Sequence, residues 1–302
     1  MSIPTPHLEK LKAAKENEKL PTAEIVRLDA AIERYNKWIS DMSAIENGSN
    51  NLIDELVNLF NDYKFYIDYD LIFSSPDDFL YRQKGQLKLD NTVIEEFLPH
   101  LVSKAFPDLN ENVVFGPRKC FSAMYFKSTL HDTKKGGGIE IRTKDQDFAI
   151  AKKLFIRASH DTDFVRYESK DAYLGYVTSE CKTNLDKTMF QEATATAHDV
   201  KMAIPGSKYF LLCEWLDMTP VSTAPTDIDE VLILRKAKRI SSNKRKNFSS
   251  AEGRIKNSDE YKEFLENNPF DVNVFKRYIN HIEGMLKDEN PEENSVLTDG
   301  YF

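Results

Sequence analysis

The run KYFLLCEWL, residues 208–216, restricts the possible folds of this chain more than any other stretch. It is almost continuously apolar, which is typical of a strand buried on both faces. A helical pattern of apolar residues from Met189 to Ile204 precedes it and closes at Pro205-Gly206. A further strand candidate, AYLGYVTSECKT, precedes that helix. Strand, helix and strand at this length predict a βαβ unit within a mixed α/β sheet.

The regions on either side of this unit differ in character. Residues 1–110 are mainly helical in pattern, with an apolar stripe in PTAEIVRLDAAIERYNKWISDMSAI and two further helical stretches in NNLIDELVNLFNDY and NTVIEEFLPHLVSKAF. An aromatic segment and a turn-prone QKGQ separate these last two. Residues 257–302 predict two short helices, broken at Asn268-Pro269, and a tail. The predicted fold is therefore an α/β mixed sheet with a helical N-terminal region and short C-terminal helices.

Composition excludes several classes of protein. The 302 residues are 41% hydrophobic with a formal net charge of −8, and no apolar run reaches the roughly 18 residues of a membrane span. The N-terminal stretch lacks the apolar core of a signal peptide, so we expect a cytoplasmic protein. Three cysteines cannot all pair, and no Cys/His spacing indicates zinc. No GxxxxGK[ST] motif is present, so we expect no use of ATP.

The strand AYLGYVTSECKT ends in an acid and a lysine two residues apart. Alternation along a strand places Glu180 and Lys182 on one face and Cys181 on the other. The same spacing recurs elsewhere in the chain, so position must decide between a simple salt pair and an active site. The pair lies at the carboxyl end of a strand in an α/β sheet, where ligands commonly bind. Phosphodiester hydrolysis at such a place would need a second carboxylate to hold magnesium.

A hairpin can supply that second carboxylate. The strand DFAIAKKLFIRAS precedes AYLGYVTSECKT, and in a hairpin the start of the first strand lies beside the end of the second. Asp147 opens the apolar first strand and is the favoured acid. Asp163 and Asp145 remain alternatives, although the strand that Asp163 would open is charged and suits a core poorly. Two earlier strand candidates, KCFSAMYF and GGGIEIRT, flank a glycine-containing loop.

Together these segments carry a resemblance to a known family. DQDFAI followed by YVTSECKTNLDKTMFQEA resembles the PD-(D/E)xK nuclease signature, with Gln146 where proline is usual. The stretch from about Asp145 to Arg239 is similar to the Bpu10I family of type II restriction endonucleases. That resemblance implies a restriction-endonuclease-like core, and it implies DNA cleavage at an asymmetric site by two related subunits.

The resemblance also implies roles for individual residues. Asp147 and Glu180 would be Mg²⁺ ligands, with the carbonyl of Cys181 a third oxygen. Lys182 would orient or deprotonate the attacking water and stabilise charge at phosphorus. Gln191 and Glu192, early in the next helix, would support the site, although a solvated helix face also explains them.

A basic segment follows the last apolar strand. LRKAKRISSNKRKNFSSAEGRIK, residues 234–256, contains many cations and a single acid in a chain that is acidic overall. A local positive stripe suits phosphate contacts, whereas a solvated basic loop is the alternative. The candidate DNA-binding residues are Arg235, Lys236, Lys238, Arg239, Lys244, Arg245 and Lys246.

Taken with the resemblance, the expected function is Mg²⁺-dependent, sequence-specific cleavage of double-stranded DNA, leaving 5′-phosphate ends, and the resemblance implies a bacterial cytoplasm. The expected partner is a second nuclease subunit, in a homodimer or a heterodimer. The alternatives are a structure-directed repair or recombination nuclease on the same core, and a catalytically silent DNA-binding protein. The expected organisation is a helical region at 1–110 for DNA recognition or subunit contacts, a nuclease core with the basic segment at 111–256, and C-terminal helices with a tail at 257–302.

Overall fold

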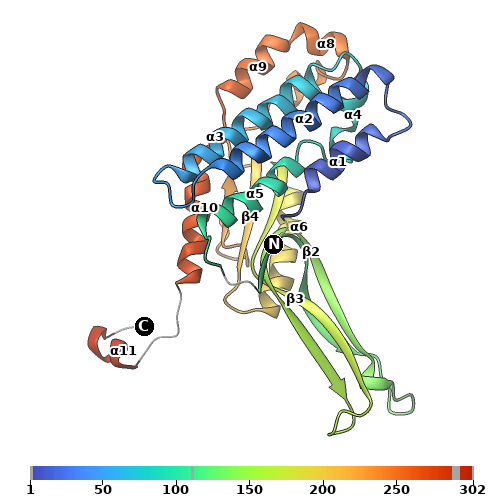
Figure 1. The fold of residues 1–302 in the computed structure, drawn as a ribbon, viewed down its shortest axis with the longest axis vertical. Coiled ribbons are helices and arrows are strands. Elements are labelled where there is room, and N and C mark those ends of the chain that lie inside the picture. Colours follow the sequence, from blue (N-terminus) through green and yellow to red (C-terminus); the bar gives the residue numbers. More distant parts are fainter. Residues whose placement is uncertain (1–2, 110–111, 288–292, 301–302) are drawn as a thin grey trace.

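A five-stranded mixed sheet forms the centre of the molecule (Figure 1). The computed structural model describes residues 3–109, 112–287 and 293–300. The strands are β1 (Val113–Phe126), β2 (Ile139–Ser159), β3 (Tyr167–Leu185), β4 (Lys208–Leu216) and β5 (Glu230–Ile233), in that spatial order. Strand β2 is antiparallel to both β1 and β3, whereas β3, β4 and β5 run parallel to one another. Helix α6 (Lys187–Ala203) connects β3 to β4, so the predicted βαβ unit and the α/β class are confirmed.

The N-terminal region is helical, as predicted, with two local differences. Its helices are α1 (Pro6–Lys15), α2 (Thr22–Ala44), α3 (Leu52–Phe65), α4 (Asp78–Leu87) and α5 (Thr92–Ala105). The aromatic segment predicted to separate two helices instead continues α3 as a π-helix, η1 (Tyr66–Phe73). The turn-prone QKGQ lies inside α4, because tertiary packing of Leu80 outweighs the cost of one glycine in a helix.

One hydrophobic core joins the helices to the sheet. Side chains of α2, α3 and α5 pack in one cluster with Phe148, Val177, Cys181 and Phe210 from the strands. A smaller cluster, which includes Phe190 of α6 and residues of β4, covers the other face. Each large apolar side chain buried in this way contributes roughly 1.5–3 kcal/mol relative to exposure. The sheet is therefore covered on both faces around the ends of β3 and β4.

A long β-arm leaves the body of the molecule (Figure 1). GGGIEIRT and DFAIAKKLFIRAS, predicted as separate strands, merge into the single strand β2, which begins at Ile139 after the three glycines and pairs with both β1 and β3. The short 3₁₀ segment Lys135–Gly138 lies against the far end of the β2–β3 hairpin. A β-carbon on Gly136, whose φ is +58°, would lie 2.7 Å from the Ala158 carbonyl oxygen. Glycine is therefore required at this close approach.

The chain after β5 is mainly helical. Its helices are α7 (Ser242–Lys246), α8 (Ala251–Lys256), α9 (Ser258–Glu266), α10 (Val272–Leu286) and α11 (Glu293–Asp299). The predicted break at Asn268-Pro269 separates α9 from α10. Part of the predicted tail, 288–292, lies outside the described residues. Cys120, Cys181 and Cys213 are free and buried. No helix within the described ranges is both long and apolar enough to cross a membrane.

Candidate active site

Glu180 and Lys182 project together from the carboxyl end of β3, as strand alternation predicts. Lys182 Nζ lies 2.6 Å from Glu180 Oε1, and their side chains are 26% and 21% exposed. The hydroxyl of Tyr209, on β4, donates to Glu180 Oε2 at 2.9 Å. Both oxygens of this carboxylate therefore have a donor, and the pair remains open to solvent on one side.

Asp147 reaches the same place from the neighbouring strand. The antiparallel register sets Phe148 opposite Ser179, so Asp147 lies beside the end of β3. Its Oδ2 accepts a hydrogen bond from the backbone N–H of Cys181 at 2.8 Å. Burial raises the pKa of Asp147, and nearby Glu180 raises it further, although the Cys181 N–H opposes the shift. The strands thus bring two carboxylates and a lysine together.

The two alternative aspartates lie elsewhere. Asp163 occupies the turn between β2 and β3, at the arm tip, and is exposed. Eleven residue steps of the β2 strand separate Phe148 from Ser159, next to that turn, or roughly 35 Å at the usual rise. Asp163 is therefore too far from Glu180 to share a metal ion with it, and that alternative is wrong. Asp145 is exposed and lies opposite Lys119 of β1.

Helix α5 adds a third carboxylate that sequence reasoning missed. Burial raises the pKa of Glu95 to about 7, and the charge of Asp147 adds to the shift. Asn91 links this helix to β3: its Nδ2 donates to Glu95 Oε1 at 2.9 Å and to the Cys181 carbonyl oxygen at 3.2 Å. The available signal was the pair Glu95-Glu96 within the apolar stretch TVIEEFLPH, where both glutamates are buried.

The donor atoms suit a hard cation such as Mg²⁺. Asp147, Glu180 and the Cys181 carbonyl all present oxygen, the ligand type that Mg²⁺ prefers. Asn91 Oδ1 is buried beside them without a hydrogen-bond partner, which leaves one more oxygen unsatisfied. The described residues contain no preformed cluster of three metal-binding side chains. A bound cation would therefore draw these oxygens together and would displace Lys182 from Glu180.

The pKa values of Lys182 and Cys181 are both raised, but for different reasons. Burial alone would lower the pKa of Lys182, but the hydrogen bond and charge of Glu180 outweigh it and the pKa is raised. Its ion pair with Glu180 therefore favours the charged form of Lys182 in this arrangement. Burial holds the pKa of the Cys181 thiol well above its usual range, so this side chain is no nucleophile.

The predicted supporting residues lie on the exposed side of α6. Gln191 and Glu192 are both exposed in the second turn of that helix. Glu192 is close enough to Lys182 for its charge to raise the lysine pKa. Its influence on the site is thus electrostatic, while Gln191 faces solvent.

The basic segment divides into one buried residue and several exposed ones. Arg235 is only 5% exposed and belongs to an internal ion-pair network, so its assignment to DNA contacts is wrong. The other cations lie at the surface: Lys236 pairs with Asp271, Arg239 and Arg245 face Asp217, Lys244 pairs with Glu260, and Lys238 and Lys246 are exposed.

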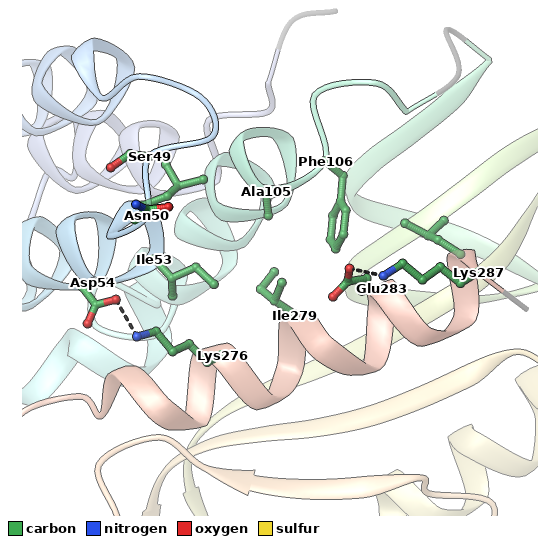
Figure 2. Close-up of a pocket in the computed structure, with 12 residues that line it drawn as sticks. Ser49, Asn50, Ile53, Asp54, Ala105, Phe106, Lys276, Ile279, Glu283 and Lys287 are labelled. Carbon is green, nitrogen blue, oxygen red and sulfur yellow. Dashed lines mark hydrogen bonds and ion pairs between the residues drawn. The ribbon is translucent and has the colours of Figure 1, made fainter.

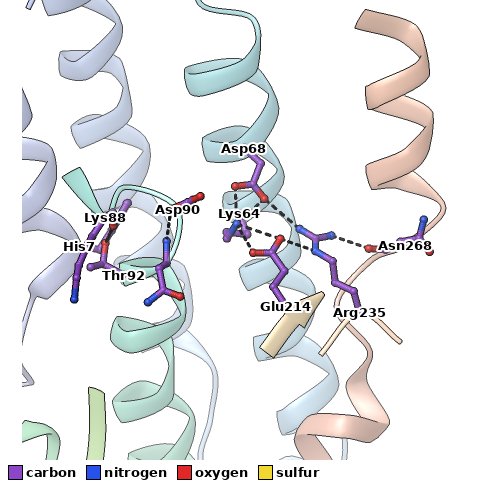
Figure 3. Close-up of polar contacts among 10 residues, drawn as sticks. His7, Lys64, Asp68, Lys88, Asp90, Thr92, Glu214, Arg235 and Asn268 are labelled. Carbon is purple, nitrogen blue, oxygen red and sulfur yellow. Dashed lines mark hydrogen bonds and ion pairs between the residues drawn. The ribbon is translucent and has the colours of Figure 1, made fainter. Parts of the chain in front are cut away.

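That internal network joins three regions of the chain (Figure 3). Lys64 Nζ, from α3, lies 2.5 Å from Asp68 Oδ1 and 3.2 Å from Glu214 Oε2 of β4. Arg235 donates from Nε to Glu214 Oε1 at 2.9 Å and from Nη1 to the Asn268 carbonyl at 2.7 Å. Two cations face two carboxylates, so the network is balanced and structural.

A groove at the helical end of the molecule has a different chemistry (Figure 2). It has a volume of about 400 Å³ and lies between α3, α5 and α10. Its two acids are already paired, Asp54 with Lys276 at 2.6 Å and Glu283 with Lys287 at 2.5 Å. Ile53, Phe106 and other apolar side chains form much of the remaining lining. The groove therefore offers no carboxylate cluster comparable to the strand-end site.

Comparisons with known proteins agree with this architecture. No curated protein matches the chain significantly by sequence. A solved structure described as the native BbvCI A2B2 tetramer shares the fold, with a TM-score of 0.57 and 18% identity. The match covers 88% of this chain and 98% of that chain. The family model of the Bpu10I restriction endonuclease matches residues 86–302, which include both acid-bearing strands and α5. The chain belongs to the Bpu10I restriction endonuclease family.

Proposed function

We propose that the chain is a Mg²⁺-dependent type II restriction endonuclease, or one subunit of such an enzyme, acting on double-stranded DNA in the cytoplasm. The observation that carries the proposal is the convergence of Asp147, Glu180 and Lys182 at one strand end, with the Cys181 N–H bonded to Asp147. Family membership supports site-specific nuclease activity on DNA. We also propose that Mg²⁺ is the cofactor, that these residues hold it and act on the phosphate, and that the products carry 5′-phosphates.

The oxygens of Asp147, Glu180 and Cys181 would hold the metal. Bound Mg²⁺ would polarise the phosphoryl group and make water a stronger acid. Lys182, released from Glu180, would place its positive charge on the non-bridging phosphate oxygens, where negative charge grows during attack. Glu95, with a pKa raised by burial to about 7, is able to accept a proton at neutral pH. Tyr209 would fix the orientation of Glu180 through its hydroxyl.

Double-strand cleavage by such a chain requires a second subunit. The candidate site occurs once in the described residues, whereas a duplex has two strands to cut. The BbvCI neighbour is described as an A2B2 tetramer, which supports an assembly of several subunits here. The β-arm exposes Phe126, Phe155 and Val165 to 55%, 74% and 73%, and such apolar exposure suits a protein contact.

The experiment is digestion of plasmid DNA by the purified chain, alone and with a candidate partner subunit, with and without Mg²⁺. We expect discrete fragments that depend on Mg²⁺, from the chain alone if it forms a homodimer and only from the two-subunit mixture if its partner is a different subunit. A limited set of fragments with 5′-phosphate ends supports the proposal. A structure-directed nuclease would instead cut branched or flapped DNA and spare plain plasmid. Binding without any cleavage in Mg²⁺ would identify a silent DNA-binding protein.

A further inference from the structure

A cavity opens at the carboxyl end of β3, immediately beyond Lys182. Its volume is about 430 Å³, and its lining begins with Thr183 and Asn184 of β3. Two residue steps along β3 lead from Lys182 to Asn184, which is roughly 7 Å along the strand. Trp215 of β4 and residues of α4, α7 and α9 complete the wall. The cavity is therefore a direct neighbour of the candidate active site.

Cations surround this cavity. Arg82, Lys84, Arg239 and Arg245 all line it. Arg239 Nη1 lies 3.0 Å from Asp217 Oδ2, and Arg245 Nη2 lies 4.0 Å from the same oxygen. Two guanidinium groups thus share one carboxylate, and their side chains remain about one third exposed. Donors are left over for an anion, and arginine binds phosphate oxygens well.

Aromatic side chains form another part of the lining. Trp215, 7% exposed, packs on Phe264 with ring centroids 4.8 Å apart, and Phe248 also lines the cavity. A flat, apolar wall beside arginines offers van der Waals contact to a nucleobase and charge to its phosphate. Neither a lone inorganic anion nor a purely apolar ligand would use both parts of the lining.

Among the described lining residues, Asp90 is the one acid. It is 6% exposed and lies between α4 and α5, in the same region as Lys88 and Thr92 (Figure 3). Its Oδ1 accepts the backbone N–H of Asn91 at 3.0 Å. A carboxylate accepts hydrogen bonds only, so it favours a base with an exocyclic amino group, such as cytosine, over thymine.

We infer that this cavity binds one nucleotide extruded from the DNA stack, with its phosphate on Arg239 and Arg245 and its base against Trp215, Phe264 and Asp90. The inference rests on the proposed function for the identity of the DNA ligand. It adds a site where the enzyme inspects one nucleotide beside the strand that it cuts. Extrusion places the base where side chains can read its Watson–Crick edge.

Free nucleotides test this inference without DNA or Mg²⁺. Trp38→Phe removes the other tryptophan, which is buried in the helical region against Tyr63, and leaves Trp215 as the fluorescent reporter. We expect dCMP to change the Trp215 emission saturably, with a millimolar Kd. Deoxycytidine and inorganic phosphate should each bind at least tenfold more weakly. We expect dTMP to bind several-fold more weakly than dCMP, and Asp90→Asn to remove that difference.

Single substitutions test which residues bind dCMP. Arg239→Ala and Arg245→Ala should each raise the Kd for dCMP about tenfold, while Arg239→Lys restores part of the affinity. Lys244→Ala is the matched control, because Lys244 is an exposed cation of α7 that pairs with Glu260 outside this cavity. Circular dichroism and thermal unfolding confirm that each variant is folded. An equal loss from Lys244→Ala would overturn the assignment of the arginines.

Other outcomes would overturn the inference as a whole. A flat titration with dCMP, or inorganic phosphate binding as tightly as dCMP, would contradict a nucleotide site. Equal affinity of the unmodified chain for dCMP and dTMP would contradict the role of Asp90. Plasmid cleavage is measured separately: cleavage without dCMP binding defeats only this inference, and dCMP binding without cleavage defeats only the proposed function.

Discussion

The balanced network around Lys64 and the strand-end site around Glu180 use the same kinds of charge in opposite ways. In the network, two cations face two carboxylates, each side chain is under 10% exposed, and every charge has a partner. At the strand end, Asp147 and Glu180 share the single cation Lys182, Glu95 lies close enough to Asp147 to feel its charge, and the pKa values of Asp147 and Glu95 are raised. A balanced set of buried charges holds regions of the chain together. An excess of carboxylates in reach of solvent is suited to binding a cation.

The largest expected effect comes from removing a carboxylate at the strand end. Asp147→Asn should reduce cleavage by at least about 10⁴-fold, or about 5.5 kcal/mol in the barrier, because a metal oxygen is lost. Stability should stay equal or rise, since burial already disfavours the Asp147 charge. Plasmid digestion and thermal unfolding measure both. The control is Asp145→Asn, an exposed neighbour that should cleave normally. Normal cleavage by Asp147→Asn would contradict the site.

Removing one charge from the balanced network should act on stability instead. Arg235→Met leaves Glu214 and Asp68 buried with one cation, which should lower the free energy of unfolding by about 3–5 kcal/mol. Urea denaturation gives the value, and cleavage by the folded fraction should persist. Lys238→Met, an exposed change in the same segment, should cost less than about 0.5 kcal/mol. Equal losses from both would show that the network contributes no stability.

Replacing Lys182 should have a smaller effect, on Mg²⁺ affinity, that distinguishes a role at the metal site from a simple salt pair with Glu180. Lys182→Met frees Glu180 Oε1, so Mg²⁺ should bind about tenfold more tightly in the absence of DNA, a gain of about 1.4 kcal/mol, although cleavage is lost. Isothermal titration with Mg²⁺ measures the Kd. Lys144→Met provides the control, because Lys144 pairs with Asp199 instead. An unchanged Mg²⁺ affinity in Lys182→Met would place the ion away from Glu180.

The last expected effect depends on pH and concerns His7, a buried histidine in the helical region. Burial lowers the pKa of His7 to about 3, so between pH 6.5 and pH 3 the unfolded chain holds a proton that the folded chain lacks. Stability from His7 is therefore lost as pH falls, by at most about 1.4 kcal/mol per pH unit. Burial raises the pKa of Glu96 to about 7, so between pH 7 and about 4.5 the folded chain holds a proton that the unfolded chain lacks. Stability from Glu96 therefore rises as pH falls through this range.

Below pH 4.5 the contribution of His7 is no longer opposed by Glu96. His7→Gln should therefore lower stability at pH 7, through its lost hydrogen bonds to Thr92 and Tyr63, yet show a shallower decline in acid. Urea denaturation across pH 3.5 to 7 gives both quantities. His131→Gln, at an exposed position, should reproduce the unmodified slope. An identical slope in His7→Gln would mean that the imidazole is charged in the folded state.

Sequence patterns predict the strand part of the site because strand geometry is local. Alternation fixes Glu180 and Lys182 on one face, and antiparallel pairing of two apolar strands sets Asp147 beside them. The same reasoning fails for Arg235, which looks like the other cations of its segment. Its burial depends on Asp68 and Glu214, residues far away in the sequence that are brought close only by packing.

The contribution of the helical region to the candidate active site depends on how α5 packs against the sheet. Asn91 bonds the Cys181 carbonyl across 90 residues of sequence and also bonds Glu95, and no periodicity records which helix face meets which strand end. The merger of two predicted strands into β2 has a similar cause. The polar residues at 144–147 resemble a turn, but β1 pairs with this stretch and keeps it extended.

The hydrogen bond from the Cys181 N–H to Asp147 gives the site its own spectroscopic reporter. An amide proton bonded to a carboxylate resonates at a position set by the charge on that carboxylate. Protonation of Asp147, or its engagement by a cation, would therefore move a single backbone resonance, that of residue 181. The buried, unreactive thiol of Cys181 leaves that signal free of side-chain titration. Magnetic resonance of one labelled amide could thus follow cation binding in the resting protein, before any DNA is added.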